Sequence, residues 1–369
     1  MGNTGAPLVA VLGGGQLGRM LAIAGLPLGV RFRFLDPTAD APAGALGPLV
    51  VGELGDEAAL AAVAEDAVAV TYEWEGVPAE AARFLEAHGS RVHPPPRALD
   101  AAQDRLAEKT LFRRLGIGTP EFAVVDDRAG LDRAEGTIGL PAVLKTRRGG
   151  YDGKGQRVIR EASDLDPAWA ALSGAPLVLE QFVAFDREVS VLAVRGRDGD
   201  TAHWPLVENE HRDGILRVSR APAPGTDAAL ERLAADYAVR VLDELGYVGV
   251  LAIELFQVGD HLLANELAPR VHNSGHWTIE GAVTSQFENH VRAIVGWPLG
   301  DTTARGVSGM VNCIGELPDP APVLAIRGAH LHDYGKAPRP GRKVGHVTVV
   351  APSPEARDDA LARLAALIE

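Results

Sequence analysis

The chain has 369 residues, a net charge of −13 and 46% hydrophobic residues. This length allows two or three domains, and the composition is that of a globular protein. The acidic charge argues against nucleic-acid binding, which depends on cationic surface. The single cysteine, Cys313, excludes an intramolecular disulfide and a cysteine-based metal cluster. No hydrophobic run is long enough to span a bilayer, and no signal peptide is indicated. We therefore expect a cytoplasmic protein with no membrane partner.

The first hundred residues alternate strands and helices, as in a doubly wound, Rossmann-like α/β domain. A hydrophobic strand at 8–12 runs into a glycine loop, a helix and a second strand at 30–35. Further elements are expected as a helix at 57–65, a strand at 67–71 and a helix at 78–88. Three prolines at 94–96 mark a stiff junction, so we expect the first domain to cover residues 1–100.

The glycine loop of this domain is compatible with a dinucleotide-binding site. Gly13, Gly15 and Gly18 satisfy G-x-G-x-x-G, and Asp36 follows at the spacing of a ribose-binding acid. An NAD(P)-dependent oxidoreductase is therefore one alternative, although the same turn serves other α/β units. Glu73-Trp-Glu75 follows the third strand, at the edge where open sheets bind ligands, and fits a ligand site or a solvated turn equally well.

A second glycine-rich segment, residues 145–156, carries a stronger signal. Glycines at 149, 150, 153 and 155 let the backbone approach a ligand closely, and Lys145 and Lys154 add positive charge. Only five of the 36 basic residues are lysines, so lysine is not the default surface cation of this chain. The segment could be a plain surface loop, but its composition favours a lid over the phosphates of a nucleotide.

The elements around this lid predict a small α/β lobe at about residues 120–190. One amphipathic helix is expected before it, at 100–115, from the spacing of Leu106, Leu111 and Leu115. The strand that ends at 180–183 offers backbone polar groups to a purine edge. Glu188 could bind ribose hydroxyls or could simply be an exposed carboxylate.

Residues 250–266 predict a β-hairpin that turns at Gly259-Asp260. Counting outward from the turn places Glu254 beside Asn265 or Glu266. Two carboxylates in a hydrophobic hairpin repel each other unless a cation lies between them. Oxygen ligands in an incomplete set suit Mg²⁺ that carries a nucleotide. A single solvent-facing glutamate is the alternative to this metal site.

Two later segments concentrate polar groups. Residues 267–278 hold Arg270, His272, Asn273, Ser274 and His276, while a proline and a glycine within them argue against a zinc-binding helix. We interpret this segment as a substrate loop beside the metal. The second segment is a basic cluster on a Pro/Gly-rich loop, which suits a substrate phosphate or could be a solvated turn, and it contains Lys336, Arg339, Arg342 and Lys343.

Taken together, these motifs resemble the ATP-grasp superfamily and, within it, the N5-carboxyaminoimidazole ribonucleotide synthetase family. The resemblance runs from residue 14 to 346, and residues 265–277 are its most specific part. Glu73-Trp-Glu-Gly76 departs from the family pattern, in which a phenylalanine and an asparagine are expected. The matching stretches are Gly14-Gly-Gln-Leu-Gly-Arg-Met20, Thr71-Tyr-Glu73, Gly149-Gly-Tyr-Asp-Gly-Lys-Gly-Gln156, His211-Arg-Asp-Gly-Ile-Leu216, Asn265-Glu-Leu-Ala-Pro-Arg-Val-His-Asn-Ser-Gly-His-Trp277 and Pro340-Gly-Arg-Lys-Val-Gly-His346.

The resemblance implies an ATP-grasp fold of three lobes around one cleft: a pre-ATP-grasp domain at 1–100, an ATP-grasp domain at 101–296 and a small β-rich domain at 297–369. It implies ATP as cofactor, with Mg²⁺ or Mn²⁺ held by Glu254 and Glu266. The implied ATP-binding residues are Arg105, Lys145, Gly150, Tyr151, Asp152, Gly153, Lys154, Gly155, Gln156, Glu180, Gln181, Phe182, Val183, Glu188, His211, Asn265 and Glu266. The implied substrate-binding residues are Gln16, Glu73, Tyr151, Arg270, His272, Asn273, Ser274, Lys336, Arg342 and Lys343, and the implied catalytic residues are Arg270, Lys154 and Asn273.

The implied reaction is an ATP- and bicarbonate-dependent carboxylation of 5-aminoimidazole ribonucleotide through carboxyphosphate. The resemblance also implies a homodimer and a separate mutase that receives the product. Besides the oxidoreductase, two alternatives stay open: another ATP-grasp ligase, such as a formate-dependent purine transformylase, and a non-catalytic binding protein with a vestigial site.

Overall fold

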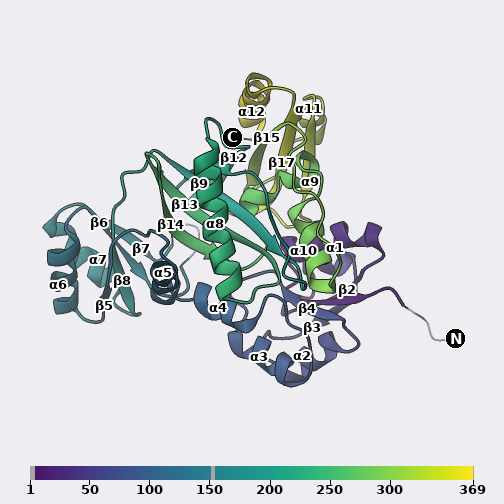
Figure 1. Ribbon diagram of the computed structural model, residues 1–369, viewed down its shortest axis with the longest axis horizontal. Coiled ribbons are helices and arrows are strands. Elements are labelled where there is room, and N and C mark those ends of the chain that lie inside the picture. The colour runs from purple at the N-terminus through teal and green to yellow at the C-terminus, as the bar shows by residue number, and fades with distance from the viewer. Residues whose placement is uncertain (1–4, 151–153, 369) are drawn as a thin grey trace.

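The computed structural model describes residues 5–150 and 154–368. The N-terminal domain is a parallel sheet with strand order β3-β2-β1-β4. Its strands are β1 (Leu8–Leu12), β2 (Arg31–Asp36), β3 (Leu49–Val51) and β4 (Ala69–Tyr72). Its helices are α1 (Gln16–Gly25), α2 (Glu57–Ala64) and α3 (Ala79–Ala87). The expected Rossmann-like domain is therefore present, at the bottom right of Figure 1.

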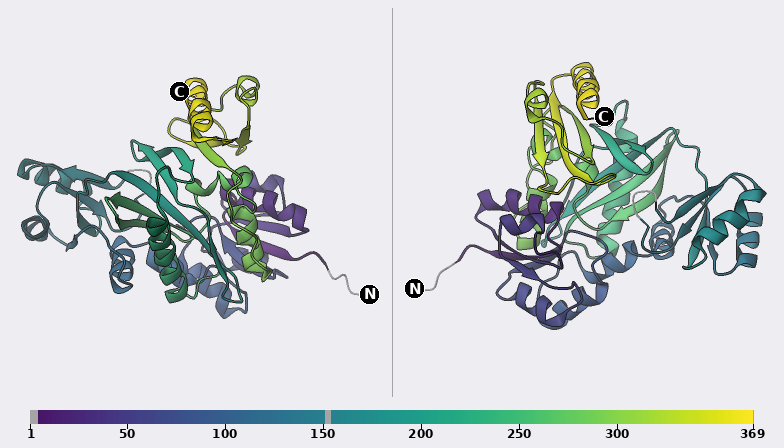
Figure 2. Two further views of the ribbon diagram at one scale, coloured as in Figure 1. Left: turned by 45° about the horizontal axis from the view of Figure 1, so that its top comes forward. Right: turned by 180° about the vertical axis from the view of Figure 1, so that it is seen from behind.

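The lid lobe is an antiparallel sheet with strand order β5-β8-β6-β7, at the left of Figure 1. Helices α6 (Arg128–Ile138) and α7 (Leu165–Leu172) pack on it. The two further views of Figure 2 show this lobe standing apart from the N-terminal domain. The strands are β5 (Phe122–Val125), β6 (Ala142–Thr146), β7 (Gln156–Ile159) and β8 (Leu177–Gln181).

The largest sheet runs through the middle of the molecule in the order β14-β13-β9-β11-β12-β15-β17-β16, with β10 paired to β9. Its central strands are β9 (Arg187–Arg195), β10 (Thr201–His203), β11 (Val207–Arg212), β12 (Ile215–Ala221), β13 (Gly249–Val258) and β14 (His261–Ala268). Helices α8 (Ala228–Glu244) and α10 (Gln286–Val295) pack on it. The helices bury hydrophobic side chains against the sheet, which forms the main core.

The C-terminal strands extend this sheet instead of forming a separate one. Strand β15 (Val307–Ile314) pairs with β12, and β17 (Lys343–Ala351) pairs with both β15 and β16 (Ala329–Asp333). Helices α11 (Pro320–Leu324) and α12 (Pro354–Ile368) belong to the same segment, and α9 (Thr278–Gly281) packs on β17. The continuous sheet fixes the C-terminal basic segment relative to the central strands.

The prediction of one helix over residues 100–115 is wrong. The chain forms α4 (Pro96–Ala102) and α5 (Arg105–Arg114), separated at Gln103 and Asp104. Asp104 caps α5 by accepting from the Leu106 N–H at 3.0 Å, and Gln103 donates to the carbonyl oxygens of Glu75 and Val77. The three leucines used for the prediction all lie after this break, so the start of the helix was placed too early. Across the described residues, no helix is both long and hydrophobic enough to cross a membrane.

Phe112 on α5 is fully buried and ties this helix to β9, β13 and α8. We expect Phe112→Ala to lower the free energy of unfolding by about 3–5 kcal/mol, because a large cavity remains in the core. Phe185→Ala is the matched control. Phe185 is 42% exposed and stacks on Phe256, so its loss should cost about 1 kcal/mol. Denaturant unfolding followed by tryptophan fluorescence measures both variants, and equal losses would contradict this packing.

Candidate active site

The first glycine loop binds carboxylates of the protein itself. The N–H groups of Gly15 and Gly18 donate to the two oxygens of Glu73 at 2.5 and 2.6 Å, and Gly14 N–H donates to Asp36 at 2.8 Å. A Cβ at Gly13 or Gly15 would lie 2.5 Å from the Glu73 side chain, so the close approach requires glycine here. The loop is thus a site for an internal anion, which removes the structural basis for the oxidoreductase alternative.

Lys336 reaches this glycine loop from the C-terminal segment. Its Nζ donates to Gln16 Oε1, and burial lowers its pKa to about 8 although the nearby Glu73 carboxylate favours the charged form. Burial also raises the pKa of Glu73, which is only partly offset by the two glycine N–H groups. Three residues predicted to bind the substrate, 16, 73 and 336, therefore meet at one junction, although Glu73 already has both oxygens engaged.

The predicted hairpin forms, and its register places Glu254 opposite Glu266. The register shifts between Glu254 and Leu255, so Asn265 is an extra residue on β14 beside the pair. Burial opposes the charge on Glu254, but the hydrogen bond and charge of His272 lower its pKa to about 2. Glu266 is exposed within the cleft. Desolvation of its carboxylate raises its pKa, and the negative charge of Glu254 raises it further.

This pair fits a magnesium ion that arrives with a nucleotide. The donor set is two opposed carboxylates with an amide beside them, all oxygen ligands of the kind Mg²⁺ prefers. Among the described residues no group of three or more His, Cys, Asp or Glu side chains could hold a metal by itself. An incomplete set of this kind leaves coordination positions for phosphate oxygens.

A buried cluster, which the sequence patterns did not predict, lies where helix α5 packs against β14. Glu108 on α5 accepts from the Leu267 N–H at 2.6 Å, and burial, then the Glu266 charge, raises its pKa to about 8. Its neighbour Lys109 is fully buried and lies 3.2 Å from Glu180 and 3.5 Å from the Asn265 carbonyl oxygen. Lys109 is one of the five lysines, so the rarity of lysine could have identified it.

Glu180 connects this cluster to the lid lobe. Its Oε2 accepts from Lys145 at 2.8 Å as well as from Lys109. Burial opposes ionisation, yet the two ammonium groups keep the pKa of Glu180 below its usual range. Its Oε1 is buried and has no hydrogen-bond partner among the described residues. A buried acceptor of this kind is expected to meet a donor on a ligand.

The neighbouring strand ends carry the other predicted nucleotide contacts. Arg105 donates to the Gly150 carbonyl oxygen at 3.4 Å, at the entrance to the lid, and Phe182 is 42% exposed. Gln156 pairs with Lys145 in the sheet register, and Gly155 lies against Thr146. Gln181 ends β8 and Val183 lies two residues beyond it, and Lys154 follows the segment 151–153. The predicted residues Tyr151, Asp152 and Gly153 lie outside the described residues.

Glu188 and His211 line one side of a small recess. Their side chains lie 2.5 Å apart, between His211 Nδ1 and Glu188 Oε2. Burial disfavours the charged ring of His211, but the hydrogen bond to Glu188 raises its pKa. The recess is lined by Glu188, Val189, Asn209, His211, Glu254, Leu255, Phe256 and Asn265. It therefore brings Glu188, which is predicted to bind the ribose, and His211, a predicted nucleotide contact, next to Glu254 of the carboxylate pair.

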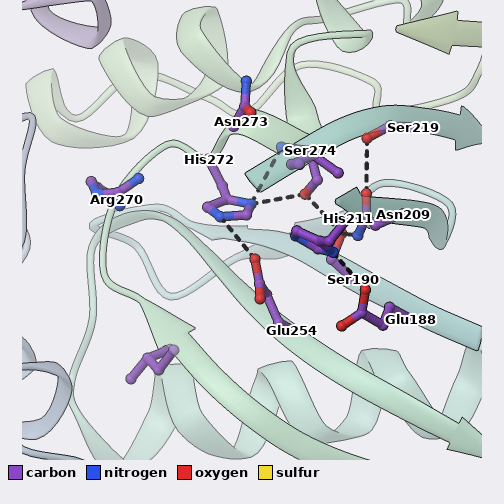
Figure 3. A network of polar contacts seen from close by, with 12 residues as sticks. Glu188, Ser190, Asn209, His211, Ser219, Glu254, Arg270, His272, Asn273 and Ser274 are labelled. Atoms are coloured by element: carbon purple, nitrogen blue, oxygen red, sulfur yellow. Dashed lines mark hydrogen bonds and ion pairs between the residues drawn. The ribbon is translucent and has the colours of Figure 1, made fainter. Parts of the chain in front are cut away.

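In the loop after β14, the His272 side chain points at Glu254, as Figure 3 shows. Arg270 pairs with Glu75, and His272 Nε2 lies 3.3 Å from Glu254 Oε1. Burial opposes the charge of Glu75, but Arg270 keeps its pKa low. Asn273 exchanges side-chain hydrogen bonds of 3.1 and 2.7 Å with Asn312 of β15, which the sequence analysis also missed.

The C-terminal basic segment also faces this cleft. Lys343, at the start of β17, is close enough to Glu254 and His211 to shift the pKa of each. Arg342 donates to the Ala337 carbonyl oxygen at 3.2 Å, and so braces the loop that carries Lys336. In contrast, His276 is buried against His346 and Phe287 and takes no part in the cleft.

Comparison with known proteins assigns this arrangement to a family. Family models match as a ribonucleotide synthetase preATP-grasp domain (residues 7–103), an ATP-grasp domain (110–287) and a phosphoribosylaminoimidazole carboxylase C-terminal domain (308–360). The N5-carboxyaminoimidazole ribonucleotide synthase of Pseudomonas aeruginosa is 52% identical over 361 residues, 98% of this chain and 99% of that protein. The chain belongs to the N5-carboxyaminoimidazole ribonucleotide synthase family.

Solved structures of this family share the whole fold. The N5-carboxyaminoimidazole ribonucleotide synthetase of Thermus thermophilus is 58% identical, covers 98% of both chains and superposes with a TM-score of 0.94. The Aspergillus clavatus synthase, in complex with ADP and 5-aminoimidazole ribonucleotide, is 31% identical over 98% of both chains, with a TM-score of 0.91. The expected ATP-grasp fold and the resemblance to this synthase family are confirmed.

The carboxylate pair gives a direct test of the metal site. We expect Glu266→Gln to abolish ATP turnover while leaving the melting temperature unchanged or raised, because the variant removes repulsion as well as a metal ligand. Glu280→Gln is the control, since Glu280 pairs with His332 at 2.8 Å away from the hairpin. It should lower the melting temperature and keep most of the turnover. A Glu266→Gln protein that retains full turnover would exclude this pair as the metal site.

Proposed function

We propose that the chain is an ATP-dependent carbon–nitrogen ligase that carboxylates the exocyclic amine of 5-aminoimidazole ribonucleotide. Bicarbonate supplies the carboxyl group, and the products are N5-carboxyaminoimidazole ribonucleotide, ADP and phosphate, in de novo purine biosynthesis. The observation that carries this proposal is the opposed pair Glu254 and Glu266 with the loop of Arg270 and His272 directly beside it. Such a site brings the phosphates of a nucleotide close to a second, anionic substrate.

ATP lies between the lid lobe and the central sheet in this proposal. The phosphates are bound by Arg105, Lys145, Lys154 and the glycine segment, which also includes Tyr151, Asp152 and Gly153. The free Oε1 of Glu180 and the strand end at 181–183 hold the adenine, and Glu188 with His211 holds the ribose. Glu254 and Glu266 hold Mg²⁺, which when bound offsets the charge on the phosphate oxygens.

The chain's own residues then organise two steps. ATP first phosphorylates bicarbonate to carboxyphosphate, because bicarbonate itself is a poor electrophile. Arg270, held by Glu75, is positioned to bind the bicarbonate and stabilise the negative charge that develops, with Asn273 alongside. The amine of the ribonucleotide then attacks the carboxyl carbon and phosphate leaves. Closure of the lid lobe would exclude water, which hydrolyses carboxyphosphate.

The ribonucleotide binds where the N-terminal domain meets the C-terminal segment. Gln16 and Lys336 already meet there, and Arg342 and Lys343 add positive charge for its phosphate. Glu73, His272 and Ser274 complete this proposed substrate site. We also propose that the protein works in the cytoplasm as a homodimer and passes its product to a separate mutase.

An assay of ADP release tests the reaction. With Mg-ATP and 5-aminoimidazole ribonucleotide present, ADP release should depend on bicarbonate, and formate should not replace it. Release with formate in place of bicarbonate would instead favour the purine transformylase alternative. The absence of any turnover, with ligand binding retained, would favour a vestigial site.

The pKa of Lys336 predicts how substrate affinity changes with pH. Below about pH 8 the ammonium is charged and can bind the phosphate of the ribonucleotide, and above this pH the charge is lost. We therefore expect the KM for the ribonucleotide to rise about tenfold from pH 7 to pH 9, where only about a tenth of the side chain stays charged. The phosphate does not titrate in this range, since its second pKa is about 6.

Lys336→Arg is the control for this pH profile, because arginine stays charged throughout. Its KM for the ribonucleotide should be nearly flat between pH 7 and pH 9. Steady-state kinetics with the ATP concentration saturating measure both proteins. If both profiles rise equally, another group causes the pH dependence.

A further inference from the structure

A chain of buried side chains leads away from His272 into the central sheet (Figure 3). His272 Nδ1 lies 2.9 Å from Ser274 Oγ, and Ser274 Oγ lies 2.7 Å from Ser190 Oγ. Asn209 Nδ2 donates to Ser190 Oγ at 3.0 Å, and Ser219 Oγ donates to Asn209 Oδ1 at 2.8 Å. Three strands and the loop after β14 thus contribute to one continuous chain.

Every member beyond His272 is shielded from water. Ser190, Ser219 and Ser274 are fully buried, and Asn209 is 6% exposed. The sheet register explains how they meet: Asn209 lies opposite Ser219, and Ser190 lies opposite Glu254. Buried hydroxyl groups must use their protons within the protein, so the direction of each hydrogen bond can be followed along the chain.

The direction is set at Asn209. Its amide group donates to Ser190 Oγ, so the Ser190 hydroxyl proton is left for Ser274 Oγ. Ser274 Oγ therefore accepts from Ser190 and donates its own proton to His272 Nδ1. The Ser274 backbone N–H also donates to this nitrogen, at 3.3 Å. Because Nδ1 receives two donors, a neutral His272 ring carries its proton on Nε2.

We propose that Ser190 and Asn209 are positioning residues that hold neutral His272 as the Nε2–H tautomer, with this proton directed at Glu254 Oε1. The distance of 3.3 Å from Nε2 to Glu254 agrees with a hydrogen bond to that carboxylate. Hydrogen bonds of this kind orient carboxylates that bind metals. Ser219 extends this network by donating to Asn209 Oδ1.

This inference rests on the proposed function for its consequence in the reaction. Nδ1 is occupied by the two donors of Ser274, and Nε2 carries a proton, so neutral His272 has no lone pair available for the proton of the ribonucleotide amine. His272 acts as a hydrogen-bond donor, and another acceptor must take that proton. The tautomer itself is a property of the protein without substrates.

Nitrogen NMR of protein labelled with ¹⁵N-histidine measures the tautomer directly. Spectra at about pH 9, where histidine rings are in general neutral, distinguish a protonated from an unprotonated ring nitrogen. The His272→Gln variant assigns the signal. We expect His272 to show a protonated Nε2 and an unprotonated Nδ1. A protonated Nδ1 in the unmodified protein would overturn the proposal.

Two variants test the role of these hydrogen-bonded side chains. Ser190→Ala removes the donor to Ser274, and Asn209→Ala removes the donor one step earlier. Each should add the second tautomer to the spectrum and lower kcat about tenfold, with the KM for ATP changed less than about twofold. Either variant is sufficient if the other fails to fold. Unchanged spectra, or an unchanged kcat despite a changed tautomer, would contradict the positioning role.

Ser308→Ala is the matched control. Ser308 is also a fully buried serine on a strand, β15, but its hydroxyl has no hydrogen-bond partner among the described residues. The control should leave both the tautomer and kcat unchanged, and a tenfold loss of kcat in it would contradict the positioning role of Ser190. If the unmodified protein shows the Nε2–H tautomer but no bicarbonate-dependent ADP release, the proposed function fails while the tautomer assignment stands.

Discussion

The repulsion between Glu254 and Glu266 is the constraint around which the cleft is built. The hairpin register holds the two carboxylates opposite each other, and the surroundings supply the compensating charge. His272 and Lys343 favour the charged form of Glu254, while Arg105 and Lys145 do the same for Glu266. These groups come from the lid lobe, helix α5, the loop after β14 and the C-terminal segment. Compensation of these two negative charges thus explains why four distant parts of the chain converge.

The glycine loop of the N-terminal domain also surrounds a buried carboxylate, but here backbone N–H groups compensate its charge. A helix N-terminus with free N–H groups attracts an anion, and here the anion is the buried carboxylate of Glu73. Lys336 then approaches this carboxylate from the C-terminal segment and contacts Gln16. The dinucleotide pattern is therefore used to join two lobes of one protein, which is why the motif alone could not decide between a cofactor site and a structural junction.

The sequence was informative wherever local geometry decides the outcome. The turn at Gly259-Asp260 sets the hairpin register, so the proximity of Glu254 to Glu266 followed from counting residues. The rarity of lysine indicated the importance of the two lid lysines. The same signal did not lead to Lys109, which is buried on a helix whose predicted start was wrong. Ser190 and Asn209 carried no local signal, because their roles arise from pairing between strands far apart in sequence.

The continuous sheet gives the two proposed substrate sites a common frame. Strand β12 pairs with β15, so the strands that carry Asn209 and Ser219 are joined directly to those that carry Asn312 and Lys343. The lid lobe has its own sheet, and the N-terminal domain has another. Hydrogen-bonded strands resist relative motion better than lobes linked by loops do. Movement on closing is therefore expected to fall on the lid lobe, while the carboxylate pair, the loop of His272 and the C-terminal cations keep their mutual distances.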